Sequence, residues 1–87
     1  MRRKKVTIHT KNGLHMRIAS RIVDRSSQSL SRIIIRKGAA SADARSIIDL
    51  LMLAATEGTD LELVVEGDDE EKVLLELEQV LIDGAGI

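Results

Sequence analysis

The chain has 87 residues, of which 13 are Lys or Arg and 14 are Asp or Glu, and it contains no Cys, Phe, Tyr or Trp. This length allows one domain with a modest core, which argues against an elaborate enzyme with a large enclosed cavity. The lack of cysteine excludes disulfides and thiolate metal sites within the chain, and a near-neutral charge without aromatic side chains disfavours nucleic acid as a partner.

The first expected element is a short strand over residues 6–9. Val6 and Ile8 alternate with Thr7 and His9, which predicts one buried face and places His9 on the outward face. The basic residues 1–5 lead into this pattern rather than into a long apolar run, so we expect neither a signal peptide nor a membrane span. These features predict a cytoplasmic protein.

An amphipathic helix is predicted from Met16 to about Gln28, because apolar and charged residues recur there with helical spacing. One face is expected to pack against the core and another to be cationic. The apolar stripe consists of Ala19, Ile22, Val23 and Ser26, and the cationic face consists of Arg17, Arg21 and Arg25. The polar segment 26–29 is expected to end this helix.

Residues Arg32 to Arg36 predict the second strand, because they include three successive isoleucines. Gly38 is expected to form a turn. The small residues from Ala39 to Asp43 then suit an edge strand that returns as a hairpin.

A second helix is predicted to begin at Ser46, since Ser46-x-x-Asp49 has the form of a helix N-cap. The run Leu50 to Ala55 is apolar almost all the way round, whereas a short helix on a single sheet buries only one side. The sheet therefore cannot cover all the apolar residues of this helix. Those left over either form an exposed docking surface or are covered by a loop. The apolar residues concerned are Ile47, Ile48, Leu51 and Met52.

The fourth strand is expected over Leu61 to Glu66, closed by Gly67, and Asp68 or Asp69 should cap the last helix, which stops at Gly84. The apolar stripe of this helix is Val73, Leu74, Leu77, Val80 and Leu81. The order βαββαβα predicts an α+β fold in a single domain over residues 1–87. Three helices on one face of a four-stranded antiparallel sheet would bury all the stripes in one core.

The segment Asn12-Gly13-Leu14-His15-Met16-Arg17 joins the first strand to the first helix and places a histidine at the start of that helix. The first backbone N–H groups of a helix lack intrahelical partners, and the helix dipole leaves partial positive charge there. An anion carried by His15 would face the N–H groups of Arg17 and Ile18. The segment therefore predicts an anion site that includes its own nucleophile.

Gly13-Leu14-His15-x-Arg17, followed by Arg45-Ser46-Ile47 at matching distance, resembles the histidine-containing phosphocarrier protein family, HPr. The resemblance covers nearly the whole chain and implies an open-faced β-sandwich. In that family the histidine accepts phosphate from enzyme I, which phosphoenolpyruvate has charged, and passes it to enzyme IIA of the sugar phosphotransferase system.

Carried over residue by residue, the resemblance makes His15 the phosphorylated residue, through Nδ1, and Arg17 its charge partner. Ser46 matches the site that an HPr kinase/phosphorylase modifies in some members. The resemblance implies no cofactor and no metal, and we expect a monomer. Partner proteins are expected to dock on Met16, Ser20, Arg21, Ile47, Ile48, Leu51 and Met52.

Three positions depart from the family pattern. Ile18 stands where proline is usual, so the start of the helix is less rigid but gains an N–H group. Met16 replaces a typically small residue and suits adaptable docking. The second helix reads Ala54-Ala55 where relatives commonly have a glycine.

Two other functions stay open. A regulatory binding module would act through phosphorylation of Ser46, in catabolite or nitrogen regulation, although the retained His15 counts against a purely regulatory role. A small ligand-binding or structural α+β domain would show no phosphorylation. Ser46 also has a simpler role as an N-cap, because S-x-x-D begins helices in many proteins without any kinase.

Overall fold

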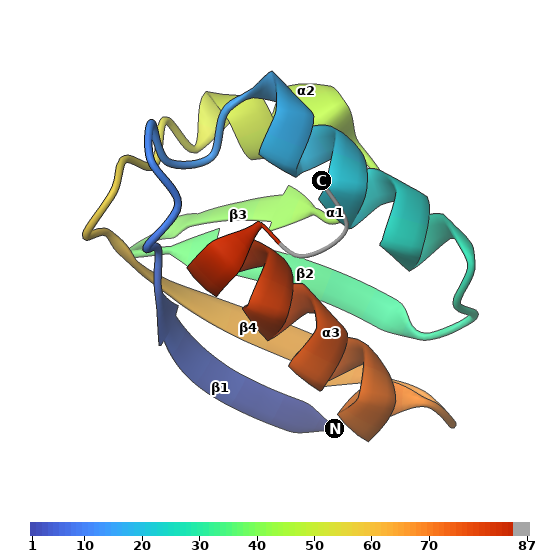
Figure 1. Cartoon of the computed structure of the whole chain (residues 1–87). Helices are drawn as coiled ribbons and strands as arrows, with labels where there is room; N and C mark the ends of the chain where they lie inside the picture. The colour runs from blue at the N-terminus through green and yellow to red at the C-terminus, as the bar shows by residue number, and fades with distance from the viewer. Residues whose placement is uncertain (85–87) are drawn as a thin grey trace.

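The computed structural model describes residues 1–84, so the last part of the domain predicted over 1–87 lies outside the described residues. The described elements follow the predicted order βαββαβα (Figure 1). They are β1 (Arg2–Thr7), α1 (Met16–Ser27), β2 (Arg32–Lys37), β3 (Ala40–Asp43), α2 (Ile47–Met52), β4 (Asp60–Glu66) and α3 (Glu70–Asp83).

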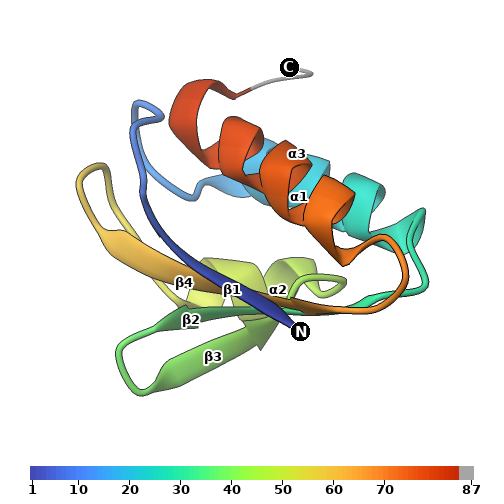
Figure 2. The same ribbon diagram turned by 90° about the horizontal axis from the view of Figure 1, so that it is seen from below.

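The strands form one antiparallel sheet in the order β1-β4-β2-β3. All three helices cover one face of the sheet, and the other face is left open (Figure 2). This confirms the open-faced α+β fold. It also confirms β3 as an edge strand, which pairs only with β2 among the described residues.

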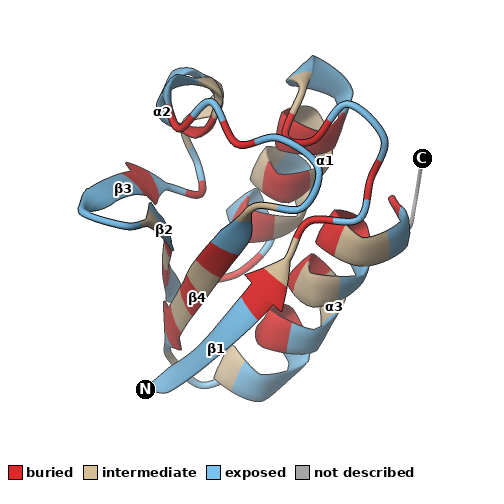
Figure 3. Ribbon diagram, turned by 90° about the vertical axis from the view of Figure 1, so that its left-hand side faces the viewer, coloured by how far each residue is buried: buried red, intermediate tan, exposed pale blue. Residues whose placement is uncertain are grey.

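A single core lies between the sheet and the helices (Figure 3). Alternation along each strand turns the apolar residues of one face toward the helices, where apolar stripes of the helices meet them. The largest fully buried side chains of this core are Ile8, Ile18, Ile22, Ile33, Ile35, Leu50, Leu61, Leu63, Leu77, Leu81, Val65 and Val73.

The prediction for the first strand was wrong in its bounds, because β1 runs from Arg2 to Thr7 rather than over residues 6–9. The basic residues pair in register with β4, from Arg2 opposite Val65 to Thr7 opposite Asp60. An edge strand tolerates such charge. Lys4 shares the helix side with the buried Val6, and its Nζ lies 2.9 Å from the carboxylate of Glu78 on α3.

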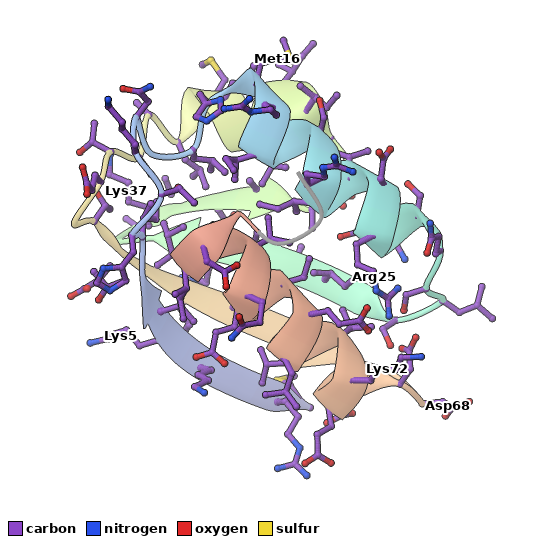
Figure 4. All side chains as sticks on the ribbon, in the orientation of Figure 1. Lys5, Met16, Arg25, Lys37, Asp68 and Lys72 are labelled. Carbon is purple, nitrogen blue, oxygen red and sulfur yellow. The ribbon has the colours of Figure 1, made fainter. Side chains whose placement is uncertain are left out.

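Helix α1 begins at Met16 as predicted and ends at Ser27. Its buried stripe contains Ile18 in addition to the predicted Ala19, Ile22 and Ser26, whereas Val23 is half-buried. The expected cationic face is partly neutralised. Arg25 (Figure 4) donates two hydrogen bonds of 2.7 Å to the carboxylate of Glu76 on α3, and these lower the pKa of Glu76.

Helix α2 begins as predicted, because the Ser46 Oγ accepts a hydrogen bond of 3.2 Å from the Asp49 N–H. It ends at Met52, so the placement of Ala54 and Ala55 in this helix was wrong. The Lys37 ammonium donates a hydrogen bond of 2.8 Å to the Leu53 carbonyl and so satisfies the helix end. The next residue, Ala54, turns the chain with a left-handed φ of 51°.

We predict that Ala54→Gly stabilises the protein by about 0.5–1 kcal/mol, because glycine adopts a positive φ without the steric cost that alanine meets there. Urea unfolding of the two proteins measures the difference. Ala55→Gly is the matched control. It should destabilise, since Ala55 is buried and has no positive φ. Equal or lower stability of Ala54→Gly would contradict the argument.

The last helix begins after Asp69 and ends at Gly84, which has the left-handed φ of 69° typical of a helix C-cap. The Asp69 side chain does not cap the helix. It accepts hydrogen bonds from the hydroxyls of Ser31 and Ser29, the latter at 2.8 Å, and thereby ties the α1–β2 loop to the start of α3. These two hydrogen bonds are the main cause of a lowered pKa of Asp69.

This lowered pKa predicts acid-dependent stability. The folded state favours the Asp69 carboxylate, so its contribution is complete above the unfolded carboxyl pKa of about 3.9 and is lost as the pH falls below that value. Asp69→Asn should therefore be less stable than the wild type at neutral pH and approach it in acid. Urea unfolding across a pH series tests this, with the exposed Asp68→Asn as control. A gap independent of pH would refute the assignment.

Candidate functional site

The loop before α1 is held in place by a close contact with the segment after α2. The Leu14 N–H donates to the Ala55 carbonyl at 2.9 Å, and the Gly13 N–H donates to the Thr10 carbonyl at 3.0 Å. A Cβ on Gly13 would lie 2.4 Å from the Ala55 carbonyl oxygen. Asn12 and Gly13 both have a left-handed φ, of 69° and 67°. The loop can therefore lie this close only with glycine at residue 13.

His15 is the N-cap of α1. Its backbone is extended, and its Nδ1 accepts a hydrogen bond of 3.3 Å from the Arg17 N–H. A ring nitrogen that accepts a hydrogen bond carries the lone pair, which assigns the proton of the neutral ring to Nε2. The nucleophilic Nδ1 lone pair is thus directed at the N-terminal end of the helix.

The first-turn N–H groups of α1 lie at the end where an anion was predicted to bind. The Ile18 N–H makes no hydrogen bond within residues 1–84. The Ile18 side chain is only 1% exposed and lies in the core. Isoleucine here therefore supplies a free donor, which proline would lack, and also anchors the first turn.

A cavity of about 410 Å³ surrounds the imidazole, between the N-terminus of α1, the loop after β1 and the C-terminal end of α3. Lys11 and Arg17 bring positive charge to it, and Asp83 brings negative charge. The full lining is His9, Thr10, Lys11, His15, Arg17, Ile18, Ile82, Asp83 and Gly84.

Lys11, His9 and the end of α3 were not predicted to lie at this site. The end of α3 meets His15 only through the tertiary fold. The single local signal was the position of His9 and Lys11 directly before the glycine loop.

The predicted docking residues lie on two helices, α1 and α2. Met16 lies on the first turn of α1 (Figure 4) and is 57% exposed, and Ser20 follows it one turn later. Arg21 lies elsewhere, because it lines the groove between α1 and α3.

On α2, Ile48 and Met52 are 74% and 78% exposed. Ile47 and Leu51 are half-buried against the core. Within residues 1–84, no loop covers Ile48 or Met52, which favours the docking surface over the covering loop.

Ser46 is half-buried at the start of α2, where its hydroxyl is used as the cap. The preceding Arg45 donates hydrogen bonds to the backbone carbonyls of Ser29 and Ser31, the latter at 2.8 Å. The start of α2 is therefore tied to the α1–β2 loop, which fixes where a group carried by Ser46 would lie.

Residues 1–84 contain no group of three or more His, Cys, Asp or Glu side chains arranged to hold a metal ion. None of the helices in this range is long and apolar enough to cross a membrane.

Comparison with known proteins matches this chain to one family model, described as "PTS HPr component phosphorylation site", over residues 2–83. The phosphocarrier protein HPr of Haemophilus influenzae is 38% identical over 71 residues, which cover 82% of this chain and 84% of that protein. The HPr-like protein Crh of Bacillus subtilis is 32% identical over 77 residues, covering 88% and 91%.

Among solved structures, the crystal structure of HPr-C-His from Thermoanaerobacter tengcongensis superimposes with a TM-score of 0.91 at 31% identity. The superposition covers 100% of this chain and 98% of that one. The same fold and the same family are therefore found by sequence and by structure.

Proposed function

This chain belongs to the HPr family, and we propose that it is the phosphocarrier of a phosphoenolpyruvate-dependent sugar phosphotransferase system. In this proposal His15 accepts a phosphoryl group from enzyme I and passes it to enzyme IIA. The observation that carries the proposal is the His15 Nδ1, which lies at the N-terminus of α1 within hydrogen-bond distance of the Arg17 N–H.

The geometry suits reversible phosphoryl transfer. The Nδ1 lone pair forms the new P–N bond, and the donor leaves with the electron pair of the bond that breaks. The phosphoryl group then replaces the lone pair at Nδ1 and faces the N–H groups of Arg17 and Ile18. The side chains of Arg17 and Lys11 line the same cavity and supply charge.

The site holds the phosphoryl group without trapping it. Helix-end electrostatics stabilise an exposed charge by about 0.3–1 kcal/mol, which orients the phosphate and leaves transfer to the next acceptor possible. The cavity is open to solvent and contains the opposing charge of Asp83. A carrier needs this balance, because it must release what it binds.

Enzyme I and enzyme IIA are the proposed partners, and their contact surface is the mainly apolar group of side chains beside His15. Met16, Ile48 and Met52 supply its exposed part, and Ser20, Ile47 and Leu51 supply its half-buried part. Arg21 would contribute from the side facing α3. In this proposal the protein acts as a monomer in the cytoplasm.

We predict that incubation with enzyme I and phosphoenolpyruvate adds one acid-labile phosphate to the wild type and none to His15→Ala, as read from intact-protein mass. Arg17→Gln should still be phosphorylated, but about tenfold or more slowly, because it loses a charge-assisted contact with the phosphate. Lys72→Gln, exposed on α3, should match the wild type. With an active enzyme I, equal labelling of His15→Ala would reject His15 as the acceptor.

A second candidate function is regulation through phosphorylation of Ser46, which is compatible with phosphoryl transfer by His15. Ser46 precedes the exposed Ile48 and Met52, so a phosphate there would place negative charge at the edge of the proposed docking surface. The kinase that would act here is an HPr kinase/phosphorylase. The likeness to the HPr-like protein Crh supports this candidate.

Two substitutions separate the capping role of Ser46 from its regulatory role. Ser46→Ala should lower the free energy of unfolding by about 1 kcal/mol, because the cap of α2 is lost, and should leave the rate of His15 phosphorylation unchanged. Ser46→Asp keeps a capping side chain and should retain stability, but its charge should raise the KM of enzyme I for this protein. An unchanged KM in Ser46→Asp would leave Ser46 with its capping role alone.

A further inference from the structure

The face of the sheet opposite the helices is not covered by any element within residues 1–84 (Figure 2). Side chains alternate across a strand, so this open face carries the strand residues that do not point into the core. On β1, β4, β2 and β3 they are Arg3, Lys5, Thr7, Asp60, Glu62, Val64, Glu66, Arg32, Ile34, Arg36, Ser41 and Asp43.

A hollow of about 320 Å³ lies on this face and contains three arginines. Arg3 pairs across with Val64, and Val64 pairs across with Ile34, so one row of the sheet forms an apolar floor beside Arg3. Arg32 and Arg36 lie two residues before and two residues after Ile34. The full lining is Met1, Arg3, Arg32, Ile34, Arg36, Ser41, Val64 and Glu66.

The three arginines surround one part of this floor. With a strand spacing of about 4.8 Å and a rise of about 3.3 Å per residue, their Cα atoms form a triangle with sides of about 12–13 Å, whose centre lies about 7 Å from each Cα. With bonds of about 1.5 Å, an extended arginine side chain reaches about 6 Å from its Cα. The three guanidinium groups can therefore approach a small anion above Val64 and Ile34 from three sides, without meeting one another.

These arginines differ from the cations on the helix side. Arg2 and Lys4 form ion pairs with carboxylates of α3, and Arg25 forms one with Glu76. In contrast, Arg3, Arg32 and Arg36 make no ion pair and no side-chain hydrogen bond to any residue of 1–84. The remaining ion pair among residues 1–84 joins the N-terminal amine of Met1 to Glu70. The side-chain hydrogen bonds of this range are likewise made by residues other than these three arginines.

Two carboxylates lie near the arginines without closing an ion pair. Glu66 is directly opposite Arg32 and lines the hollow, and Glu62 is directly opposite Arg36. Neither carboxylate comes within 4.0 Å of an arginine nitrogen to form an ion pair. The side chains that line the hollow include three arginines and one carboxylate, Glu66, which leaves an excess of positive charge.

We propose that this hollow binds a small metabolite that carries a pyrophosphate or two phosphate groups. Guanidinium groups bind phosphate oxygens through two parallel hydrogen bonds, and several of them around one site match such a multiply charged anion. The volume is at the lower end of that of small-molecule sites. The chain has no aromatic side chain on which a nucleic-acid base could stack. The site is independent of the proposed phosphoryl transfer, because His15 lies on the helix side.

Titration of ¹⁵N-labelled protein with inorganic pyrophosphate, without divalent cations, tests the proposal. Amide signals around Ile34 and Val64 should shift and saturate. Arg3→Gln and Arg36→Gln should each weaken the measured affinity about tenfold or more. The matched control is Arg2→Gln, because Arg2 neighbours Arg3 but points to the helix side, and it should change the affinity less than about twofold.

Three results would overturn the proposal. Shifts centred on the amides of Arg17 and Ile18 would place the anion at α1 instead. Equal weakening in Arg2→Gln and Arg3→Gln, or shifts that never saturate, would reveal only nonspecific attraction. Tighter binding of a Glu-rich peptide than of pyrophosphate at the same residues would make the hollow a protein-docking site. All the substituted arginines are exposed, and thermal unfolding of each variant is the check that it folds.

Discussion

The close contact between Gly13 and the Ala55 carbonyl is the constraint on which the His15 site depends. It fixes the loop before α1 through the Leu14–Ala55 hydrogen bond, and α1 then begins at Met16 with His15 as its cap. The contact also requires α2 to end early, because Ala54 turns the chain through a left-handed conformation that presents the next carbonyl. Unfavourable backbone conformations at Asn12 and Ala54 are thus held together beside the candidate active site.

The balanced net charge of the chain conceals a division between its two faces. On the helix side, cations of β1 and α1 are paired with carboxylates of α3, and these pairs tie the edge strand and the helices together. On the open face, three arginines lie around an apolar floor and have no ion-pair partner among residues 1–84. Charges that stabilise the fold are therefore separate from charges that are free to bind a ligand.

The His15 site has the properties that a carrier requires rather than those of a tight binding site. Its donors are backbone N–H groups at a solvent-open helix end, and Arg17, Lys11 and Asp83 bring opposing charges to the same cavity. The adjacent α2 presents apolar side chains that a partner enzyme can bury while it completes the site. In the proposed function, specificity depends on docking, and the chemistry depends on the local geometry of one helix terminus.

Patterns within short segments of the sequence determined the order of the elements, the position of His15 at the start of a helix, the Ser46 cap and the exposure of part of α2. These features follow from periodicity, capping and turn residues, which act between neighbours in the chain. The tertiary structure alone decided that β1 begins at Arg2, because pairing with β4 and ion pairs to α3 support charges that look unlike a strand. It also decided that α2 ends at Met52, where Lys37 of β2 binds the helix end. The same holds for Asp83 beside His15, since contacts between segments distant in sequence leave no periodic signal within either segment.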